Sequence, residues 1–394
     1  MKFIHTADLH IGKRICERSM LEDQRYILAE ILKIVEEEKP DGVLIAGDVY
    51  DKSVPSAEAV EALDDFLVKL SDFGTKVFVL SGNHDSAERI AFGGRLMASR
   101  NVFMSPVYTG EFAPVTLKDE FGEVDVWMLP FVRPATIKAS LGVGEEADAE
   151  REQITDYTSA IGMALSKMNR IPGRRNVLLA HQFVTGAQVD EAGSEEFVGG
   201  LDNVDSYVFE GFDYVALGHI HRPQNVAVNK SGVGYVRYSG TPLKYSLSEA
   251  PHKKSVTVVE LGDELEIREI PLKPMRDVRK IEASFETLVS AEFRETQVRE
   301  GKSLDDYIYA VLTDEIDVSD AAAKLRGYYP NLMALTYNNS RTRSVANLDS
   351  ENVDQKTPEE VFSDFFKEMN NREMDEEESE FVKDLIKSIW EGNR

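Results

Sequence analysis

The sequence is short of cysteine, of positive charge and of long apolar runs. Its single cysteine, Cys16, excludes an internal disulfide framework. No run of apolar residues is long enough to cross a bilayer, and the first residues contain neither the apolar core nor the cleavage site of a signal peptide. We therefore expect a cytoplasmic protein that does not associate with membranes.

Acidic residues outnumber basic ones by 70 to 45, which gives the 394-residue chain a formal net charge of −25. This excess of acid argues against a protein that wraps nucleic acid in a uniformly basic surface. It does not exclude a nucleic-acid substrate, because bound metal ions are large local positive charges that a formal count omits. A partner subunit could supply further positive charge.

Apolar strands alternate with amphipathic helices in the first part of the chain. Strands are predicted there at residues 2–6, 42–46 and 76–80, and helices at 20–38 and 57–70. Two further strands are predicted at 176–180 and 213–217. This alternation is typical of βαβ units, so we predict an α/β fold with a largely parallel sheet. Ligand sites in such sheets lie beyond the carboxyl ends of the strands. Short strands with turns follow residue 224 and predict a second sheet that closes the domain.

The chain divides into four segments. Residues 1–274 form the α/β domain, which ends at the segment Pro271–Pro274, and residues 275–338 have the pattern of a small α+β module. Residues 339–356 are polar and poor in apolar side chains, which is typical of a linker. Residues 357–394 carry two amphipathic helical patterns, the first opened by a Thr-Pro-Glu-Glu helix start.

Side chains that bind metals gather directly after the predicted strands. Five of the 7 histidines stand there: His10, His84, His181, His219 and His221. Asp8, Asp48 and Asn83 belong to the same clusters. Imidazole and carboxylate together suit manganese, zinc or iron, while the lack of clustered cysteine argues against a structural zinc site. We predict two divalent metal ions.

The residue types suggest distinct roles within this set. Asp48 can bridge two cations with its two carboxylate oxygens, and two such ions can polarise a phosphodiester. His84 follows Asn83 directly and is better placed as a proton donor to the leaving oxygen than as a ligand. Asp85 could orient His84 or raise its pKa. Each motif alone has a simpler explanation, such as a turn capped by Asn83 or a buried structural histidine. The occurrence of all these motifs together, each after one of five strands, favours a metal site.

The set as a whole resembles the calcineurin-like metallophosphoesterase superfamily over roughly residues 1–270. The resemblance rests on Asp8-x-His10, Gly47-Asp48-x-x-Asp51, Gly82-Asn83-His84-Asp85, His181 and Gly218-His219-x-His221. Within the superfamily the chain resembles the SbcD family, the nuclease subunits of bacterial SbcC–SbcD complexes. Further matches to that family are the segments 1–10, 82–89, 238–246 and 312–315.

The resemblance implies a β-sandwich flanked by helices, a small α+β cap domain and C-terminal helices. It implies that Asp8, His10, Asp48 and His221 hold one ion and that Asp48, Asn83, His181 and His219 hold the other, with manganese as the working metal. His84 would be the catalytic histidine. Relatives from archaea and eukaryotes usually have histidine where Asp51 stands. Because this sequence departs from them at that position, Asp51 is assigned a supporting role next to the ligands and not a place among them.

The same resemblance implies a homodimer that cuts DNA and acts in DNA repair, recombination and replication. Its duplex exonuclease activity would depend on ATP through an SbcC-type coiled-coil ATPase, and it would also act as a hairpin and single-strand endonuclease. The two C-terminal helices would dock on that ATPase, or alternatively fold back on their own cap. The rival functions are a small-molecule or cyclic-nucleotide phosphodiesterase on the same metal cage, and a metal-free scaffold.

Overall fold

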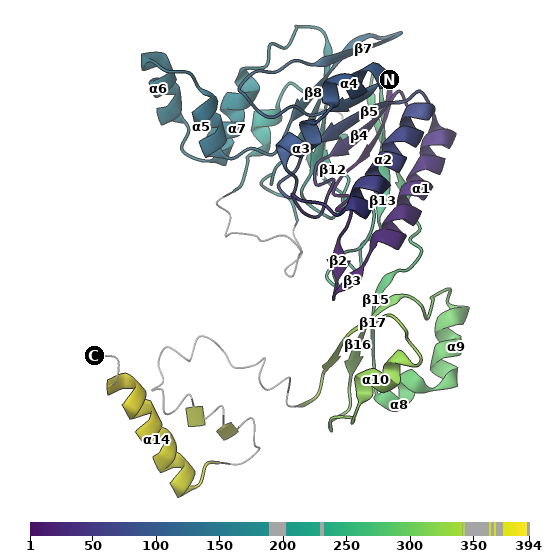
Figure 1. The fold of residues 1–394 in the computed structure, drawn as a ribbon, viewed down its shortest axis with the longest axis vertical. Helices are drawn as coiled ribbons and strands as arrows, with labels where there is room; N and C mark the ends of the chain where they lie inside the picture. Colours follow the sequence, from purple (N-terminus) through teal and green to yellow (C-terminus); the bar gives the residue numbers. More distant parts are fainter. Residues whose placement is uncertain are drawn as a thin grey trace. The chain divides into compact units, whose positions relative to one another are not determined.

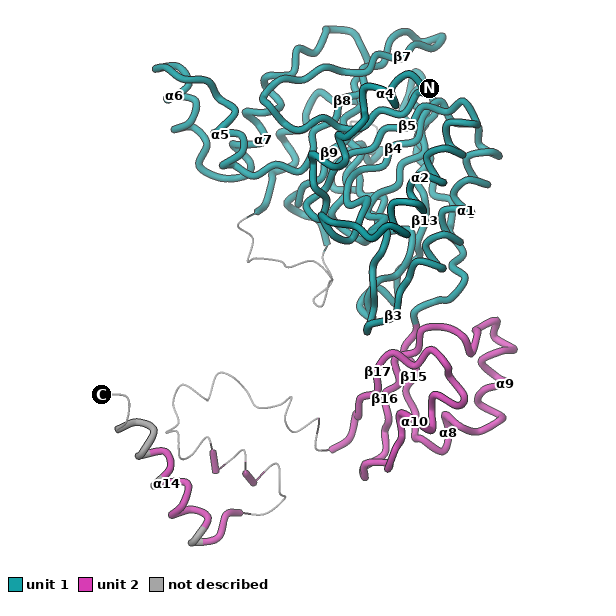
Figure 2. Tube along the Cα trace, in the orientation of Figure 1, with its two compact units in different colours: residues 1–278 teal, residues 279–394 magenta. Residues whose placement is uncertain are grey.

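The computed structural model describes residues 1–188, 202–228, 232–340, 342, 362–363, 366–367 and 373–391. The chain divides into two compact units, residues 1–278 and 279–394 (Figure 2). The boundary falls shortly after the segment Pro271–Pro274. None of the described helices is long and apolar enough to span a bilayer.

The first unit is built on two six-stranded sheets (Figure 1). The first sheet has the order β14-β13-β1-β4-β5-β6. Its strands are β1 (Lys2–Thr6), β4 (Gly42–Ala46), β5 (Lys76–Leu80), β6 (Val102–Met104), β13 (Ser255–Leu261) and β14 (Leu265–Pro271). The strands β1, β4, β5 and β6 are parallel, whereas β13 and β14 pair antiparallel at the other edge.

The second sheet has the order β11-β12-β10-β9-β8-β7. Its strands are β7 (Val115–Asp119), β8 (Gly122–Leu129), β9 (Arg175–His181), β10 (Tyr214–Gly218), β11 (Gln224–Val228) and β12 (Gly234–Tyr238). The four central strands are parallel, and a hairpin partner flanks them at each edge. The second sheet is therefore itself largely parallel, which the short strands after residue 224 did not reveal.

Apolar side chains from both sheets meet in one core. Phe3, Leu44 and Phe78 of the first sheet pack in the same buried cluster as Val126 and Leu179 of the second. His5 also lies fully buried here, and its Nδ1 is 2.8 Å from the hydroxyl of Tyr214. Burial lowers the pKa of His5 to about 3, so this histidine is a neutral structural residue.

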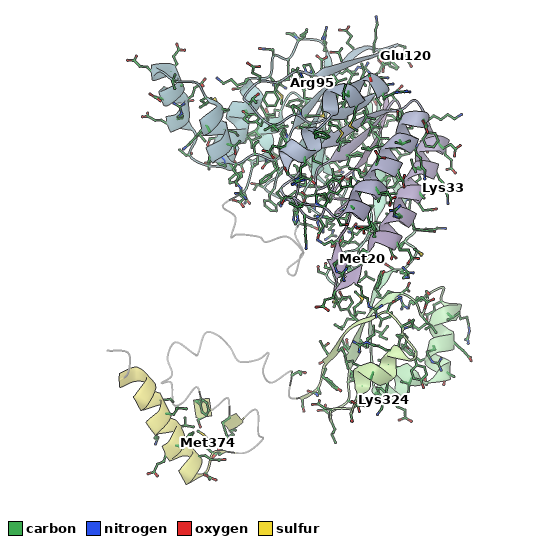
Figure 3. The ribbon with its side chains drawn as sticks, viewed as in Figure 1. Met20, Lys33, Arg95, Glu120, Lys324 and Met374 are labelled. Atoms are coloured by element: carbon green, nitrogen blue, oxygen red, sulfur yellow. The ribbon has the colours of Figure 1, made fainter. Side chains whose placement is uncertain are left out.

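Helices cover the outer faces of the two sheets (Figure 1). On the first sheet lie α1 (Leu21–Glu38) and α2 (Ala57–Asp72), whose buried positions recur every three or four residues. The opposite face of α1 points to solvent and carries Lys33 (Figure 3). Ser56 caps α2 by accepting the backbone N–H of Ala59.

The second sheet is covered by α5 (Pro134–Ser140), α7 (Tyr157–Ser166) and the 3-10 turn Ser206–Phe209, which share a buried cluster with β8, β9 and β10. The acidic stretch 142–152 lies at the surface and contains the exposed helix α6 (Glu145–Gln153), whose first turn carries three acidic residues. Acidic side chains at a helix N-terminus are favourable because they face its positive dipole end.

The second unit has its own small core. Its sheet has the order β15-β16-β17, formed by β15 (Val278–Ala283), β16 (Tyr307–Leu312) and β17 (Leu332–Tyr337). The helices α8 (Phe285–Val289), α9 (Ala291–Arg299) and α10 (Ala321–Arg326) accompany the sheet. The fully buried Leu288, Ile308, Leu312 and Leu325 lie in its core.

The C-terminal part of the chain is described only in pieces. Asn339 is buried and donates from its side chain to the carbonyl of Asp314, so the compact α+β module extends at least this far. Most of the predicted linker and of the first amphipathic helix lies outside the described residues. The second helix is α14 (Glu376–Glu391). The predicted α/β sandwich with an α+β module is confirmed.

Candidate metal centre

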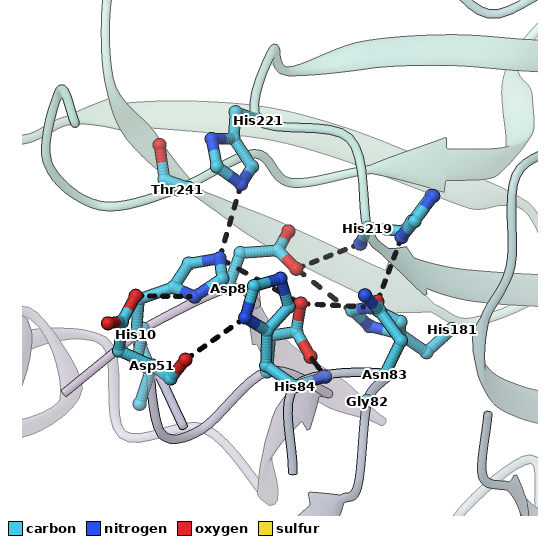
Figure 4. A network of polar contacts seen from close by, with 12 residues as sticks. Asp8, His10, Asp51, Gly82, Asn83, His84, His181, His219, His221 and Thr241 are labelled. Carbon is cyan, nitrogen blue, oxygen red and sulfur yellow. Dashed lines mark hydrogen bonds and ion pairs between the residues drawn. The ribbon is translucent and has the colours of Figure 1, made fainter. Parts of the chain in front are cut away.

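The polar residues after five parallel strands converge at one edge of the two sheets (Figure 4). Asp8 and His10 follow β1, Asp48 follows β4, and the Asn83-His84 pair follows β5. In the second sheet, His181 ends β9 and His219 follows β10. Parallel strands bring their carboxyl ends to a common edge, which explains why residues so distant in sequence meet here.

The backbone around these residues is strained. Asp8, His10, Asp48 and His219 all have positive φ angles, of 52°, 44°, 46° and 102°. Residues with a Cβ rarely adopt such angles; each one costs about 1–3 kcal/mol and persists only where the surrounding structure enforces it. Backbone hydrogen bonds supply that enforcement: the N–H of Asp8 donates to Gly47 and the N–H of His10 donates to Asp48. The chain bends sharply at these points and so turns the side chains toward one another.

Three glycines give the site its close packing. A Cβ on Gly47 would lie 2.2 Å from Nδ1 of His181, and one on Gly82 would lie 2.1 Å from Oδ1 of Asp48. A Cβ on Gly218 would lie 1.9 Å from the carbonyl oxygen of Ala46. All three distances are far below contact distance, so these positions accept only glycine without rearrangement.

Asp48 lies at the centre of the ligand set. The ligand atoms of Asp8, Asp48 and His181 lie within 4.8 Å of one another, and those of His10, Asp48 and His84 form a second such group. Asp48 therefore belongs to both groups. Its Oδ2 and the Oδ2 of Asp8 are buried and accept no hydrogen bond from the described residues. Buried carboxylate oxygens without donors are costly unless a cation satisfies them, so the donor set fits divalent metal ions.

Asn83 and the remaining histidines extend this set. The side-chain oxygen of Asn83 lies 2.9 Å from Nε2 of His181 and 3.0 Å from Nδ1 of His219. Across the site, Nε2 of His10 lies 3.2 Å from Nε2 of His221. All seven predicted ligands are thus brought together.

The electrostatics reflect the crowding of charges. Burial raises the pKa of Asp8 to about 7. Burial opposes the charged form of His181, but the carboxylates of Asp48 and Asp8 outweigh it and raise the pKa of His181 to about 10. In the absence of a cation the site therefore holds protons in its place, and metal binding must release them.

His181 is fixed by a backbone contact. Its Nδ1–H donates to the carbonyl of Ala46 over 2.9 Å, so Nε2 faces Asp48 and Asn83. A backbone partner of this kind selects the tautomer of a metal-binding histidine. His181, at the end of β9, is thus oriented by the last residue of β4, a strand of the other sheet.

His84 lies beside the centre, where its ring meets that of His10 edge to face at 4.9 Å between centroids. Its Nδ1 is 3.0 Å from the carbonyl oxygen of Asp51, which can accept the proton on that nitrogen. The carboxylate of Asp51 lies 3.8 Å from Nδ1 of His10 and pairs with Lys13 at 2.8 Å. Asp51 thus lies next to His10, and its supporting role there stays a prediction.

Asp85 differs from the expectation. Among the described residues its carboxylate accepts backbone N–H groups from Val49, Tyr50 and Gly82 and makes no hydrogen bond to His84. It ties the turn after β4 to the turn after β5. The orientation of His84 comes instead from the backbone carbonyl of Asp51. An Asp one position after a histidine points away from it in this turn, so sequence adjacency was misleading.

The residues that support the first turn are not among the predicted site residues. Gln24 of α1 is buried; its side-chain N–H groups donate to the carbonyl of His10 and to the hydroxyl of Tyr245, and its oxygen accepts the N–H of Gly12. Tyr245 in turn donates to the carbonyl of Leu9. The available signal was a polar residue inside the apolar stripe of a helix.

Comparisons with known proteins identify the family of the chain. Residues 1–223 match the calcineurin-like phosphoesterase family, and residues 274–370 match the type 5 capsule protein repressor C-terminal domain. The curated relatives include the SbcD subunit of the nuclease SbcCD from Staphylococcus epidermidis, 28% identical over 394 residues, and its counterpart from Staphylococcus saprophyticus, 30% identical over 397. Both alignments cover 99% of each chain. A solved dimetal phosphatase from Danio rerio is 12% identical, with a TM-score of 0.40, and the match covers 70% of this chain and 98% of the other.

The chain therefore belongs to the calcineurin-like phosphoesterase family and is an enzyme that hydrolyses phosphoesters with divalent metal ions. Its match to relatives over the full length assigns it, within that family, to the SbcD nuclease subunits. The resemblance drawn from the sequence motifs is confirmed.

Proposed function

We propose that this protein is a metal-dependent DNA nuclease that acts with an SbcC-type ATPase in DNA repair, recombination and replication. It would degrade duplex ends in an ATP-dependent manner and cut hairpins and single strands as an endonuclease. The observation that carries the chemistry is the position of Oδ2 of Asp48, which lies 3.8 Å from Nε2 of His10 and 3.3 Å from Nε2 of His181, the histidines of two different ion sites. The choice of DNA as substrate is supported by the nuclease names of its full-length relatives. Such a substrate would place the enzyme in the cytoplasm, at the nucleoid.

The metal centre would hold two Mn²⁺ ions, with Asp48 between them. Asp8, His10 and His221 would complete one coordination sphere, and Asn83, His181 and His219 the other. Bound there, two divalent ions neutralise charge on the phosphate and activate the attacking water. The nitrogen and oxygen donors suit Mn²⁺, although the same set accepts zinc or iron.

His84 would donate the proton to the leaving oxygen. Its Nδ1 faces the carbonyl of Asp51, so Nε2 is the nitrogen that exchanges protons with the substrate. The backbone N–H of His84 donates to Oδ1 of Asp48 over 2.9 Å. This bond fixes the position of His84, the proposed proton donor, relative to Asp48, which would lie between the two ions.

The C-terminal helix would bind the ATPase. On α14, Phe381 and Leu385 are 69% and 46% exposed and lie one turn apart, while Val382 is buried. Exposed apolar side chains at this spacing suit a helix that lies in a groove of a partner. Deletion of residues 357–394 should abolish co-purification with the ATPase and leave metal binding intact; retained co-purification would instead favour helices that fold back on their own chain.

A second exposed apolar pair supports a homodimer. Phe92, at the end of α3 (Ala87–Ala91), and Leu96, in α4 (Gly94–Met97), are 84% and 80% exposed. Large apolar side chains so exposed and so close in sequence mark interaction surfaces. Sedimentation of the wild type should give a dimer, and a Phe92→Asp/Leu96→Asp variant a monomer. A wild type that sediments as a monomer would contradict this assignment.

The nuclease assignment is tested with DNA. The purified chain is incubated with Mn²⁺ and with linear duplex, hairpin and circular single-stranded DNA, with and without its ATPase partner and ATP. We expect cleavage of hairpins and single strands by the chain, and ATP-dependent duplex degradation only with the partner. The variant Asp48→Asn should abolish all of it.

A generic aryl phosphodiester is run in parallel. Hydrolysis of this compound without any cut in DNA would reject the nuclease and favour a small-molecule or cyclic-nucleotide phosphodiesterase. We also expect the isolated chain to bind duplex DNA weakly because of its charge of −25. Tight binding with a steep dependence on salt would show that the ATPase is not the main source of DNA affinity.

A further inference from the structure

A buried charged cluster lies behind His221, in the segment between β12 and β13. Glu249 is fully buried and Lys254 is 5% exposed. Neither belongs to the ligand set, and the sequence motifs assign them no role. Charged residues are almost never this deeply buried unless they are paired, so the cluster requires an explanation.

Both carboxylate oxygens of Glu249 are occupied. Its Oε1 lies 3.1 Å from Nδ1 of His221 and also accepts the backbone N–H of Tyr245 at 3.3 Å. Its Oε2 accepts a hydrogen bond from the ammonium of Lys254. Glu249 therefore presents one carboxylate oxygen to a ring nitrogen of His221 and the other to the ammonium of Lys254.

This contact decides which nitrogen of His221 faces the metal centre. When Nδ1–H donates to the carboxylate of Glu249, Nε2 is the nitrogen with the lone pair. That atom points across the site and lies 3.2 Å from Nε2 of His10 (Figure 4). Glu249, which lies on the side of the His221 ring away from the metal centre, thus selects the tautomer that a metal ligand requires.

Lys254 holds the same residue at a second point. Its ammonium donates to the backbone carbonyl of His221 at 2.9 Å and to the hydroxyl of Thr241 at 2.6 Å, in addition to Glu249. These three bonds use all three of its N–H groups. The backbone N–H of Thr241 also donates to the carbonyl of His221. His221 is therefore held by its ring through Glu249 and by its backbone through Lys254.

The glycine that precedes Thr241 allows this close approach. Gly240 has a φ of +72°, and a Cβ there would lie 2.6 Å from the carbonyl oxygen of His221. The loop after β12 consequently packs its backbone directly against the ligand.

We propose that Glu249 and Lys254 are positioning residues, a buried ion pair that fixes the tautomer and the place of His221 as a ligand of one of the two metal ions. This inference rests on the metal centre of the proposed function. It predicts that loss of the acceptor at position 249 weakens one ion site and leaves the ion site that does not include His221 unchanged.

Removal of one charge alone would leave its partner buried and unpaired, which strongly destabilises the fold and would obscure any effect on metal binding. The test therefore uses two neutral double variants, Glu249→Gln/Lys254→Met and Glu249→Leu/Lys254→Met. Both lack the ion pair and have similar side-chain volumes. They differ in whether residue 249 can accept a hydrogen bond from His221.

Mn²⁺ binding to the full chain is measured by calorimetry and by electron paramagnetic resonance, and folding by thermal melting. We expect the Leu/Met variant to bind one of two ions about 10–100-fold more weakly than the Gln/Met variant, and the Gln/Met variant to bind that ion more weakly than the wild type because it lacks Lys254. Equal affinities in the two variants would overturn the role of Glu249, and a Gln/Met variant that matches the wild type would overturn the role of Lys254. A wild type that binds fewer than two ions would instead refute the metal centre itself.

Discussion

At the scale of single residues, Asp48 connects the two halves of the site. Its Oδ1 accepts the backbone N–H of His84, whereas its Oδ2 lies 3.3 Å from Nε2 of His181 and 3.8 Å from Nε2 of His10. One carboxylate, itself at the end of β4, thus contacts residues from three other strand ends. No other described residue belongs to both groups of ligand atoms.

His84→Ala tests the division between ligands and acid. We expect the variant to keep both metal ions and to lose about 10²–10⁴-fold in rate, because a positioned proton donor is worth that much. Hydrolysis and Mn²⁺ stoichiometry are measured on the same preparation, with His252→Ala as a control outside the metal centre. Since His84 lies in one group of ligand atoms, loss of an ion in the variant would identify it as a ligand instead.

Gly218→Ala tests the close packing at the end of β10. The added methyl group would lie 1.9 Å from the carbonyl oxygen of Ala46 and 2.7 Å from Nδ1 of His181, so either both of these atoms or the backbone of Gly218 must move. We expect a loss of about 1–3 kcal/mol in the free energy of unfolding, measured with urea, together with weaker Mn²⁺ binding. The control is Gly142→Ala, where a Cβ meets nothing within 4 Å. Equal stability of the two variants would refute the steric argument.

At the scale of elements, the metal centre depends on two sheets that present their carboxyl edges together. At the opposite edge, Arg175 at the start of β9 donates to Asp119 at the end of β7 and to the carbonyl of Leu261 at the end of β13. Strand β13 belongs to the first sheet, whereas β7 and β9 belong to the second. Arg175 therefore links the two sheets at the end away from the ligands.

Asp119→Asn tests this link through its dependence on pH. Hydrogen bonds from Arg175 hold the pKa of Asp119 well below its usual range. A lowered pKa stabilises the fold above the unfolded value of about 4 and ceases to do so as the pH falls. We expect the variant to be less stable than the wild type by about 1.5–3 kcal/mol at pH 7, with the difference narrowing below about pH 4.

Urea unfolding at several pH values measures this effect. Its control is Glu120→Gln at the neighbouring exposed residue, which should change stability little at any pH. The free energies of unfolding of Asp119→Asn and wild type are compared as the pH falls below the unfolded pKa of about 4. A difference between them that stays constant over this range would show that the charge of Asp119 is not involved.

At the scale of the whole molecule, the chain has two units with separate hydrophobic cores. All seven ligands belong to the first unit. A cation that binds only the native state stabilises it by an amount that grows with concentration, about 2.7 kcal/mol at one hundred times the dissociation constant. Metal should therefore stabilise one unit selectively.

Scanning calorimetry with and without a chelator tests this expectation. Mn²⁺ should move the transition of residues 1–278 to higher temperature and leave that of residues 279–394 in place. The variant Asp48→Asn should lose most of the shift. A shift of both transitions by the same amount would mean that the two units unfold as one.

The sequence by itself determined the elements and the kinds of ligand. Local periodicity places α1 and the parallel strands within a few residues, because the pattern of burial along one element depends on its own side chains. The same periodicity puts Asp8, Asp48 and His181 at strand ends. Nothing in the sequence, however, states which strands are neighbours, and the second sheet was recognised only in outline.

Only the tertiary structure decided which residues support the ligands. Gln24, Glu249 and Lys254 contact ligands that are 14, 28 and 33 positions away in the chain. Within the described residues, Asp85 accepts backbone N–H groups from the turns after β4 and β5 and makes no hydrogen bond to the histidine beside it. Contacts of this kind depend on how separate elements pack, which no local pattern encodes. The local sequence determines which residues are available as metal ligands. The packing of the two sheets and of the loops between them determines how those side chains are oriented.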